Sequence, residues 1–305
     1  MADAVLNQES GAAWMMYHAD CVEVLRSLPD NSIDLSVFSP PFGSLFVYSE
    51  SERDMGNSSS DGEFAAHYQF VASELLRIIK PGRLVAVHCS DLPMRKSIEG
   101  AVGLKDFSGE LVRIHIAAGW IYHSRITVWK DPVVEMQRTK AIGLLYKQLR
   151  KDSCKSRVGM PDYVLLFRKP GENAAPVPHD ASQFVLPQWQ EWASPVWTTV
   201  DQTNVLNGRG VREEKDERHL CPLQLDIIER LVVMYSNRDD VIISPFAGIG
   251  SEGAVSVKMG RKFIGIELKE SYFAQACRNL TQAETEASSL GGLFTWKQER
   301  EEGAA

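Results

Sequence analysis

The chain of 305 residues lacks long apolar runs and cysteine motifs. No stretch approaches the ~18 apolar residues of a membrane helix, and residues 1–11 lack the basic start and apolar core of a signal peptide. The five cysteines include no C-x-x-C pair, which argues against a zinc site and a disulfide framework. We therefore predict a cytoplasmic protein with reduced thiols and no metal centre.

Positive charge is scarce overall, since the formal net charge is −7, but it is unevenly distributed. Residues 125–169 hold eleven basic and four acidic side chains. This local surplus would suit a nucleic-acid phosphate backbone, and a solvated surface with acids nearby is the alternative. The candidate phosphate contacts are Arg138, Lys140, Lys147, Arg150 and Lys151.

Strand-like and helix-like patterns alternate along most of the chain. The apolar run 33–38 predicts a strand, which Pro40-Pro41 ends because proline cannot continue a ladder of hydrogen bonds. Residues 64–79 repeat apolar side chains at helical spacing, and Lys80-Pro81-Gly82 is expected to end that helix. Further strands are predicted at 84–87, 121–129, 163–167, 241–243 and 263–266, and further helices at 111–118, at 269–285 and from Pro222. This alternation implies an α/β fold with a mostly parallel sheet covered on both faces.

One stretch, residues 131–218, breaks the alternation with a basic helix-like piece and a segment rich in proline and tryptophan. We interpret it as an insertion between two halves of one domain, residues 1–130 and 219–290. The polar residues 291–305 are predicted to be a disordered tail.

A glycine turn, Ser244-Pro245-Phe246-Ala247-Gly248-Ile249-Gly250, joins a predicted strand to a predicted helix. In this setting glycines let a cofactor approach the backbone closely. Glu267 lies 19 residues past Gly248, at the end of the next strand, where a carboxylate can accept hydrogen bonds from both hydroxyls of a ribose. Two alternatives stay open. The glycines could serve packing alone, or, since Gly253 completes the spacing G-x-G-x-x-G, a dinucleotide could bind.

A second turn, Ser39-Pro40-Pro41-Phe42, follows the strand 33–38 at the edge where open α/β sheets bind ligands. An aromatic amino nitrogen is a poor nucleophile because its lone pair is delocalised. If the Ser39 hydroxyl and the Pro40 carbonyl accepted both amino hydrogens, they would favour a pyramidal nitrogen able to attack a methyl group. Rigid prolines would hold that geometry, and Phe42 could stack on a base. A Pro-Pro turn with a structural role only is the alternative.

Together, the two turns resemble motifs of the amino-methylating DNA methyltransferases, (Asp/Asn/Ser)-Pro-Pro-aromatic and Phe-x-Gly-x-Gly. The catalytic motif comes first and the basic insertion separates the two, which is similar to the permuted order of the β class. The resemblance implies a Rossmann-like methyltransferase fold with circularly permuted motifs, S-adenosylmethionine as cofactor and double-stranded DNA as substrate. It also implies that residues 131–218 are a target recognition region, and it leaves open a homodimer and a partner nuclease.

Further segments carry the resemblance. Tyr17 to Asp34 resembles the family's opening segment, whose acid lies near the adenine of the cofactor, and residues 219–223 resemble the motif that helps enclose its methionine portion. The catalytic residues would be Ser39, Pro40, Pro41 and Phe42, and the cofactor-binding residues Asp20, Cys21, Pro222, Ser244, Phe246, Ala247, Gly248, Gly250 and Glu267. The sequence departs from the family at Ser251-Glu252, where a threonine is expected soon after the glycines.

The target base is predicted from Ser39. In this family Ser-Pro-Pro more often accompanies cytosine N4, and Asp-Pro-Pro-Tyr accompanies adenine N6, so we expect cytosine N4 with adenine N6 as the alternative. Methylation of cytosine C5 needs a cysteine nucleophile in a Pro-Cys dipeptide, and the chain has none. RNA or a protein amide would be a different substrate for the same geometry, and an inactive binding module is a third hypothesis.

Overall fold

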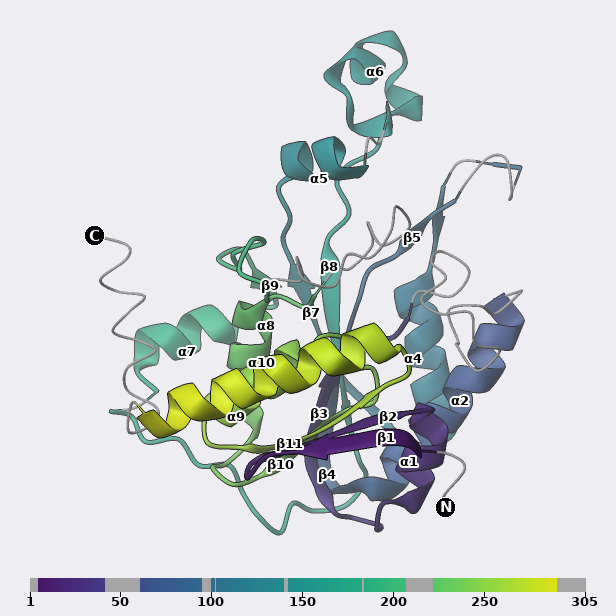
Figure 1. Ribbon diagram of the computed structural model, residues 1–305. Coiled ribbons are helices and arrows are strands. Elements are labelled where there is room, and N and C mark those ends of the chain that lie inside the picture. The colour runs from purple at the N-terminus through teal and green to yellow at the C-terminus, as the bar shows by residue number, and fades with distance from the viewer. Residues whose placement is uncertain are drawn as a thin grey trace.

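The computed structural model describes residues 5–41, 61–94, 100–101, 103–139, 142–182, 184–206 and 222–289. Within these residues the centre is a nine-stranded sheet with the strand order β1-β2-β11-β10-β3-β4-β8-β7-β9 (Figure 1). Its strands are β1 (Val5–Ser10), β2 (Trp14–Ala19), β3 (Ile33–Phe38), β4 (Ile79–Cys89), β7 (Ile121–Val128), β8 (Asp162–Arg168), β9 (Val196–Trp197), β10 (Val241–Ser244) and β11 (Lys262–Glu267). The short strands β5 (Leu92–Pro93) and β6 (Leu104–Lys105) pair with each other.

Strand direction brings seven carboxyl ends to one edge of the sheet, those of β2, β11, β10, β3, β4, β7 and β9. The strands β2, β11, β10, β3 and β4 run parallel. β8 is antiparallel both to β4 and to β7, so β7 runs parallel to β4. The predicted mostly parallel sheet is therefore confirmed, and every residue of β3 is buried, as expected for a strand covered on both faces.

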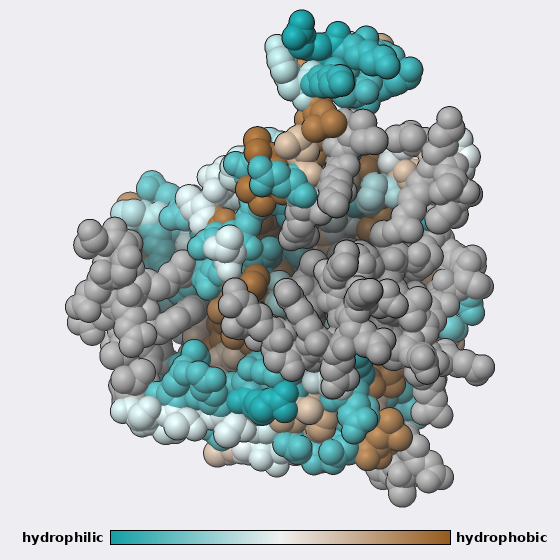
Figure 2. Space-filling view, turned by 45° about the horizontal axis from the view of Figure 1, so that its top comes forward, coloured by the Kyte–Doolittle hydropathy of each residue, from teal (hydrophilic) through white to brown (hydrophobic). Residues whose placement is uncertain are grey.

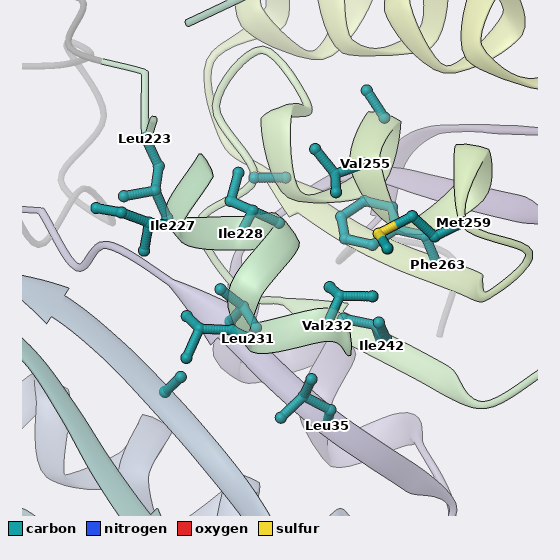
Figure 3. Close-up of a cluster of buried hydrophobic side chains, with 14 of the residues drawn as sticks. Leu35, Leu223, Ile227, Ile228, Leu231, Val232, Ile242, Val255, Met259 and Phe263 are labelled. Atoms are coloured by element: carbon teal, nitrogen blue, oxygen red, sulfur yellow. The ribbon is translucent and has the colours of Figure 1, made fainter. Parts of the chain in front are cut away.

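Helices cover both faces. On one face lie α1 (Cys21–Ser27), α2 (Asp61–Ile78) and α4 (Phe107–Ala118), and on the other lie α8 (Leu225–Tyr235), α9 (Ser251–Lys258) and α10 (Glu270–Ser289). Beneath α8, the side chains of Leu231 and Val232 lie over Leu35 of β3 and Ile242 of β10 (Figure 3). Such burial of aliphatic side chains is the main stabilising contribution to an α/β core.

The two ends of the chain interleave in this sheet. The late strands β10 and β11 lie between the early strands β2 and β3. From β10 the chain crosses over α9 to β11 on one side, whereas from β3 it crosses over α2 to β4 on the other side. The carboxyl edge between β10 and β3 is therefore a topological switch point, where open α/β sheets bind ligands.

The structure differs from the sequence predictions at several places. Lys80-Pro81-Gly82, expected to end a helix, lies within β4. The helix expected from Pro222 begins at Leu225, with Gln224 as its N-cap, because the Leu225 N–H donates to Asn204 O and holds the preceding residues extended. The strand expected within the insertion is β8, which joins the central sheet.

Two further sequence features can be compared with the structure. Cys21, Cys89, Cys154 and Cys277 are free thiols, and Cys221 lies outside the described residues. Among the described helices, none is long and apolar enough to cross a membrane. Residues 291–305, predicted as a tail, also lie outside the described residues.

Candidate active site

The glycine turn, residues 244–250, links β10 to α9. Gly248 (φ 52°) and Gly250 (φ 84°) adopt the left-handed conformation that favours glycine, and Gly250 is the N-cap of α9. A Cβ on Gly250 would lie 3.2 Å from Ala276, and one on Gly253 would lie 2.5 Å from Phe263. A Cβ on Gly248 would meet no atom within 4 Å. Packing therefore explains Gly250 and Gly253, whereas Gly248 faces open space that a ligand could fill.

Glu267 borders this open space from the end of β11. Its Oε2 atom accepts a hydrogen bond from the Gly248 N–H (2.9 Å), and its Oε1 atom accepts one from the Lys269 N–H (2.8 Å). These two hydrogen bonds fix the orientation of the carboxylate beside the glycine turn. The position and orientation suit recognition of a ribose.

Asp20 and Cys21 follow β2, the neighbour of β11. Asp20 caps α1, because its Oδ1 atom accepts a hydrogen bond from the Val22 N–H (2.8 Å). Burial raises the pKa of the Cys21 thiol, and the charges of Asp20 and Glu267 raise it further. The strand ends of β2, β11 and β10 therefore gather Asp20, Cys21, Glu267 and the glycine turn at one edge.

Two more residues of the glycine turn face the switch point. The Ser244 hydroxyl is fully buried and has no hydrogen-bond partner in the structure, although a buried hydroxyl is rarely left unsatisfied. The Phe246 ring lies 5.7 Å from the ring of Phe38, the residue before Ser39. An open glycine, an oriented carboxylate and an unsatisfied hydroxyl fit a bound nucleoside cofactor beside the Ser-Pro-Pro turn.

The Ser-Pro-Pro turn, residues 39–41, begins a row of polar side chains. Pairing of Phe38 with Val87 places Ser39 beside His88 at the end of β4, with Ser39 Oγ 2.8 Å from His88 Nδ1. Pro40 is buried and Pro41 half-buried. Phe42 lies outside the described residues.

The row continues across the sheet to β8 and β7. His88 Nε2 lies 3.2 Å from Asp162 Oδ2, and Asp162 Oδ1 lies 2.5 Å from Lys130 Nζ. Burial raises the pKa of Asp162, but the charges and hydrogen bonds of His88 and Lys130 lower it more, to about 2. Asp162 is therefore a buried carboxylate that stays ionised at neutral pH. We call Ser39, His88, Asp162 and Lys130 the polar row.

Sequence reasoning missed His88 and gave Asp162 and Lys130 no role beyond their charge. One signal was present: His88 is a polar residue at the end of a run of buried apolar residues, at the same edge as Ser39. A polar side chain in that position marks a ligand site in α/β folds. The contacts themselves depend on strand pairing, which no local pattern reveals.

The predicted phosphate-binding residues lie in a projecting segment, residues 129–161, between β7 and β8. It contains α5 (Pro132–Thr139) and α6 (Tyr146–Lys151) and rises from the edge where β3 and β4 end, as a hydrophilic projection (Figures 1 and 2). Lys147, Arg150 and Lys151 are exposed and share one face of α6. Arg138 lies in α5, without a described side chain, and Lys140 lies outside the described residues.

The base of the projecting segment is held by a buried carboxylate. Glu135 Oε1 lies 3.0 Å from Arg157 Nη2, and Glu135 Oε2 accepts a hydrogen bond from the Met160 N–H (2.7 Å). These contacts join the part of the projecting segment that leads to α6 with the part that returns from it, and so they hold the base of the segment in place.

The family comparison decides the class of the protein. A family model described as DNA methylase, N6_N4_Mtase, matches residues 33–278, which include the Ser-Pro-Pro turn, the polar row and the glycine turn. The chain belongs to this DNA methylase family. The predicted family and the predicted class of enzyme, a DNA methyltransferase, are thereby confirmed.

The methylase has distant relatives of known name. It is 23% identical over 266 residues to the type II methyltransferase M.BamHI of Bacillus amyloliquefaciens, which covers 83% of this chain and 54% of M.BamHI. It is 24% identical over 273 residues to the DNA adenine methyltransferase YhdJ of Escherichia coli, which covers 87% of this chain and 82% of YhdJ. The chain thus spans about half the length of M.BamHI and most of YhdJ.

Solved structures confirm the fold class of the methylase. TTHA0409 of Thermus thermophilus, solved in complex with S-adenosyl-L-methionine, superposes with a TM-score of 0.62 at 21% identity over 87% of this chain and 93% of its own. The PvuII DNA methyltransferase, named as cytosine-N4-specific, has a TM-score of 0.63 at 19% identity over 93% of this chain and 95% of its own. The methylase therefore has the predicted Rossmann-like methyltransferase fold.

Glu252 gives the methylase a pH-dependent stability. Burial raises the pKa of this carboxyl from 4.5 to about 8, its backbone N–H lowers it somewhat, and Glu267 raises it. At a pH between 4.5, the pKa in the unfolded chain, and about 8, the pKa in the folded chain, the unfolded chain has released the proton and the folded chain keeps it. Stability is therefore lost as the pH rises through this window, by on the order of 1 kcal/mol per pH unit. We expect the melting temperature of Glu252→Gln to fall less with rising pH than that of the wild type. Thermal unfolding measured from pH 5 to pH 8.5 tests this.

The control for this prediction is Glu172→Gln, at an exposed turn residue. It should keep the wild-type dependence of melting temperature on pH. If Glu252→Gln also kept that dependence, the buried carboxyl would not be the group that titrates.

Proposed function

We propose that the methylase transfers a methyl group from S-adenosylmethionine to an exocyclic amino nitrogen of a base flipped out of double-stranded DNA, with cytosine N4 as the target. The observation that carries the proposal is the position of Ser39, which follows β3 at the edge where the adjacent strand β10 leads into the glycine turn with its open Gly248. Family membership and the ligand named with TTHA0409 support the cofactor.

The cofactor would supply an electrophilic methyl group on a sulfonium sulfur. Gly248 and Glu267 would hold it, since they border the open space, together with Asp20 and Ser244 at the same edge of the sheet. Ser39 Oγ and Pro40 O would accept the two hydrogens of the amino group and turn its lone pair toward the methyl group. The buried Pro40 keeps its carbonyl in place without reorganisation.

Base flipping is part of the proposal, because a stacked base cannot bring its amino group to the edge of a protein sheet. The choice of cytosine rests on Ser39. The names of similar proteins include both an adenine methyltransferase and a cytosine-N4-specific enzyme, so they support the reaction and not the base.

The proposal assigns recognition of DNA to residues 131–218 and backbone contacts to the projecting segment. Its basic face rises from the same edge of the sheet as Ser39, so a duplex bound by α6 would lie over the Ser-Pro-Pro turn. Arg138 and Lys140 belong to the same proposal by sequence.

The test is incubation of the purified protein with labelled S-adenosylmethionine and unmethylated duplex DNA, followed by digestion to nucleosides and mass spectrometry. We expect N4-methylcytosine. N6-methyladenine would keep the mechanism and overturn the choice of base. Label found only in RNA or protein would contradict the assignment of DNA as substrate.

Loss of the basic face of α6 should weaken DNA binding. For the triple variant Lys147→Gln, Arg150→Gln, Lys151→Gln we expect weaker affinity for duplex DNA of any sequence. The slope of log affinity against log salt should fall by about 0.9 for each phosphate contact removed. Fluorescence anisotropy over a range of salt concentrations measures both quantities.

A matched control removes three exposed positive charges elsewhere: Arg26→Gln on α1, Lys262→Gln at the start of β11 and Arg278→Gln on α10. It makes the same change in net charge. If both triple variants lost affinity and slope equally, the effect would be one of overall charge and the role of α6 would be refuted.

A further inference from the structure

We propose that His88, held by Asp162 and Lys130, orients the Ser39 hydroxyl and receives, through Ser39, the proton that leaves the amino group after methyl transfer. His88 is thus a positioning residue and proton acceptor that acts through Ser39. The inference rests on the proposed function, since it assumes that Ser39 holds the amino group.

The polar row lies on one face of the sheet. Side chains alternate between faces along a strand, so residues two apart share a face. Each member of the row stands two residues from a buried residue of one apolar cluster: Ser39 from Val37, His88 from Ala86, Asp162 from Val164 and Lys130 from Val128. Four neighbouring strands, β3, β4, β8 and β7, therefore present the row side by side at the ligand-binding edge.

The carboxylate of Asp162 selects the tautomer of His88. An ionised carboxylate is an acceptor only, so Asp162 Oδ2, 3.2 Å away, favours the tautomer with the proton on Nε2 by electrostatic attraction, although the contact lacks the geometry of a hydrogen bond. In a neutral imidazole the Nδ1 atom then has a lone pair and accepts from the Ser39 O–H across 2.8 Å. With its own hydrogen directed to His88, Ser39 Oγ presents its lone pairs to the amino group.

The same contacts provide a path by which the proton of the amino group passes through Ser39 to His88. As the nitrogen–methyl bond forms and the sulfur–methyl bond breaks, the amino nitrogen becomes positively charged. It gives one N–H proton to Ser39 Oγ while the original Ser39 proton passes to His88 Nδ1. The base is then neutral and the imidazolium lies against Asp162, from which solvent later removes the proton.

The groups around His88 suit both the neutral imidazole and the imidazolium. Ser39 faces it from β3 and Asp162 from β8, and the Lys130 ammonium offsets part of the negative charge of Asp162. On the opposite face of β4, burial raises the pKa of the Cys89 thiol, the charges of Asp162 and Asp91 raise it further, and Arg125 lowers it.

Helix α8 packs over the same face of the sheet, and its charged residues have partners of their own. Asp226 accepts hydrogen bonds from Asp201 N and Asn204 Nδ2, and Arg230 pairs with Glu191. Glu229 also has a partner. The charge that acts on His88 is therefore mainly that of Asp162.

The test compares single-turnover methyl transfer to duplex DNA by the wild type and His88→Asn over a range of pH. An asparagine oxygen can accept from Ser39 near the position of Nδ1, but it cannot hold the proton. We expect a rate about 10²-fold lower, as is typical of lost proton transfer, and the loss of the acid limb of the wild-type pH profile. Cofactor affinity by calorimetry should stay within twofold, and the exposed control His67→Asn on α2 should keep the wild-type rate.

A second variant, Lys130→Gln, leaves His88 in place and gives it the whole charge of Asp162. The acid limb of the pH–rate profile of this variant should move to higher pH, which a purely structural role would not cause. If His88→Asn fails to fold, the Lys130→Gln variant still tests the inference. A wild-type rate and acid limb in His88→Asn, or an unmoved limb in Lys130→Gln, would overturn the inference. Absence of any methylated nucleoside with the wild type would instead contradict the proposed function.

Discussion

Ser39→Ala is expected to lower the single-turnover rate of methyl transfer by about 10²- to 10³-fold, the range seen when one preorganised hydrogen-bonding group is removed from a transition state. The variant removes the acceptor of an amino hydrogen and the link to His88, which lies 2.8 Å away. Cofactor affinity should be unchanged, because the residues that border the space beside Gly248 are intact. The measurements are quenched-flow transfer of a labelled methyl group to duplex DNA and calorimetric titration of the cofactor.

The matched control is Ser36→Ala, the same change three residues earlier on β3. The Ser36 hydroxyl is buried and donates to Ile243 O, away from the polar row, so the rate should stay near that of the wild type. If the Ser39→Ala protein lost cofactor binding, this result would contradict the assignment of Ser39 to the amino group.

Glu267→Ala is expected to weaken binding of S-adenosylmethionine by about 10²-fold or more. Hydrogen bonds to a charged group contribute roughly 1.5–3 kcal/mol each, and the ribose would lose two of them. The Gly248 N–H would also lose its acceptor, which orients the glycine turn. Calorimetry measures the affinity, and the maximal rate at saturating cofactor should change much less.

Two variants sharpen this result. Glu270→Ala removes an exposed carboxylate three residues further on and should keep wild-type affinity. Glu267→Gln keeps an acceptor oxygen but loses the charge, so its affinity should fall between those of the wild type and Glu267→Ala. Equal affinity in all four proteins would refute the ribose role.

The fold could be predicted where local pattern and packing agree. The strand expected at 33–38 and the helix expected at 64–79 correspond to β3 and α2 within one or a few residues. The strand expected at 84–87 extends over Ile79–Cys89 because Lys80-Pro81-Gly82, taken as the end of a helix, lies within β4. The pairing of β3 with β4 shifts register between Ile33 and Leu35, so an irregularity accommodates these residues.

Other features had no local signal. β1 is mostly exposed and owes its strand conformation to pairing with β2, so no apolar alternation marks it. The glycine turn and the Ser-Pro-Pro turn were visible because each is continuous in sequence. The polar row was not, because strand pairing brings Ser39 to His88, 49 residues away, and His88 to Asp162 on a third strand.

The interleaved strand order has a consequence for synthesis of the protein. A ribosome releases the Ser-Pro-Pro turn early, but β10 and β11, which fill the gap between β2 and β3, emerge only after the projecting segment has been made. A nascent chain therefore exposes unpaired strand edges and has no cofactor site until β10 and β11 have been made. For the same reason, a chain severed within the projecting segment should yield two inactive pieces whose activity returns only when they are mixed.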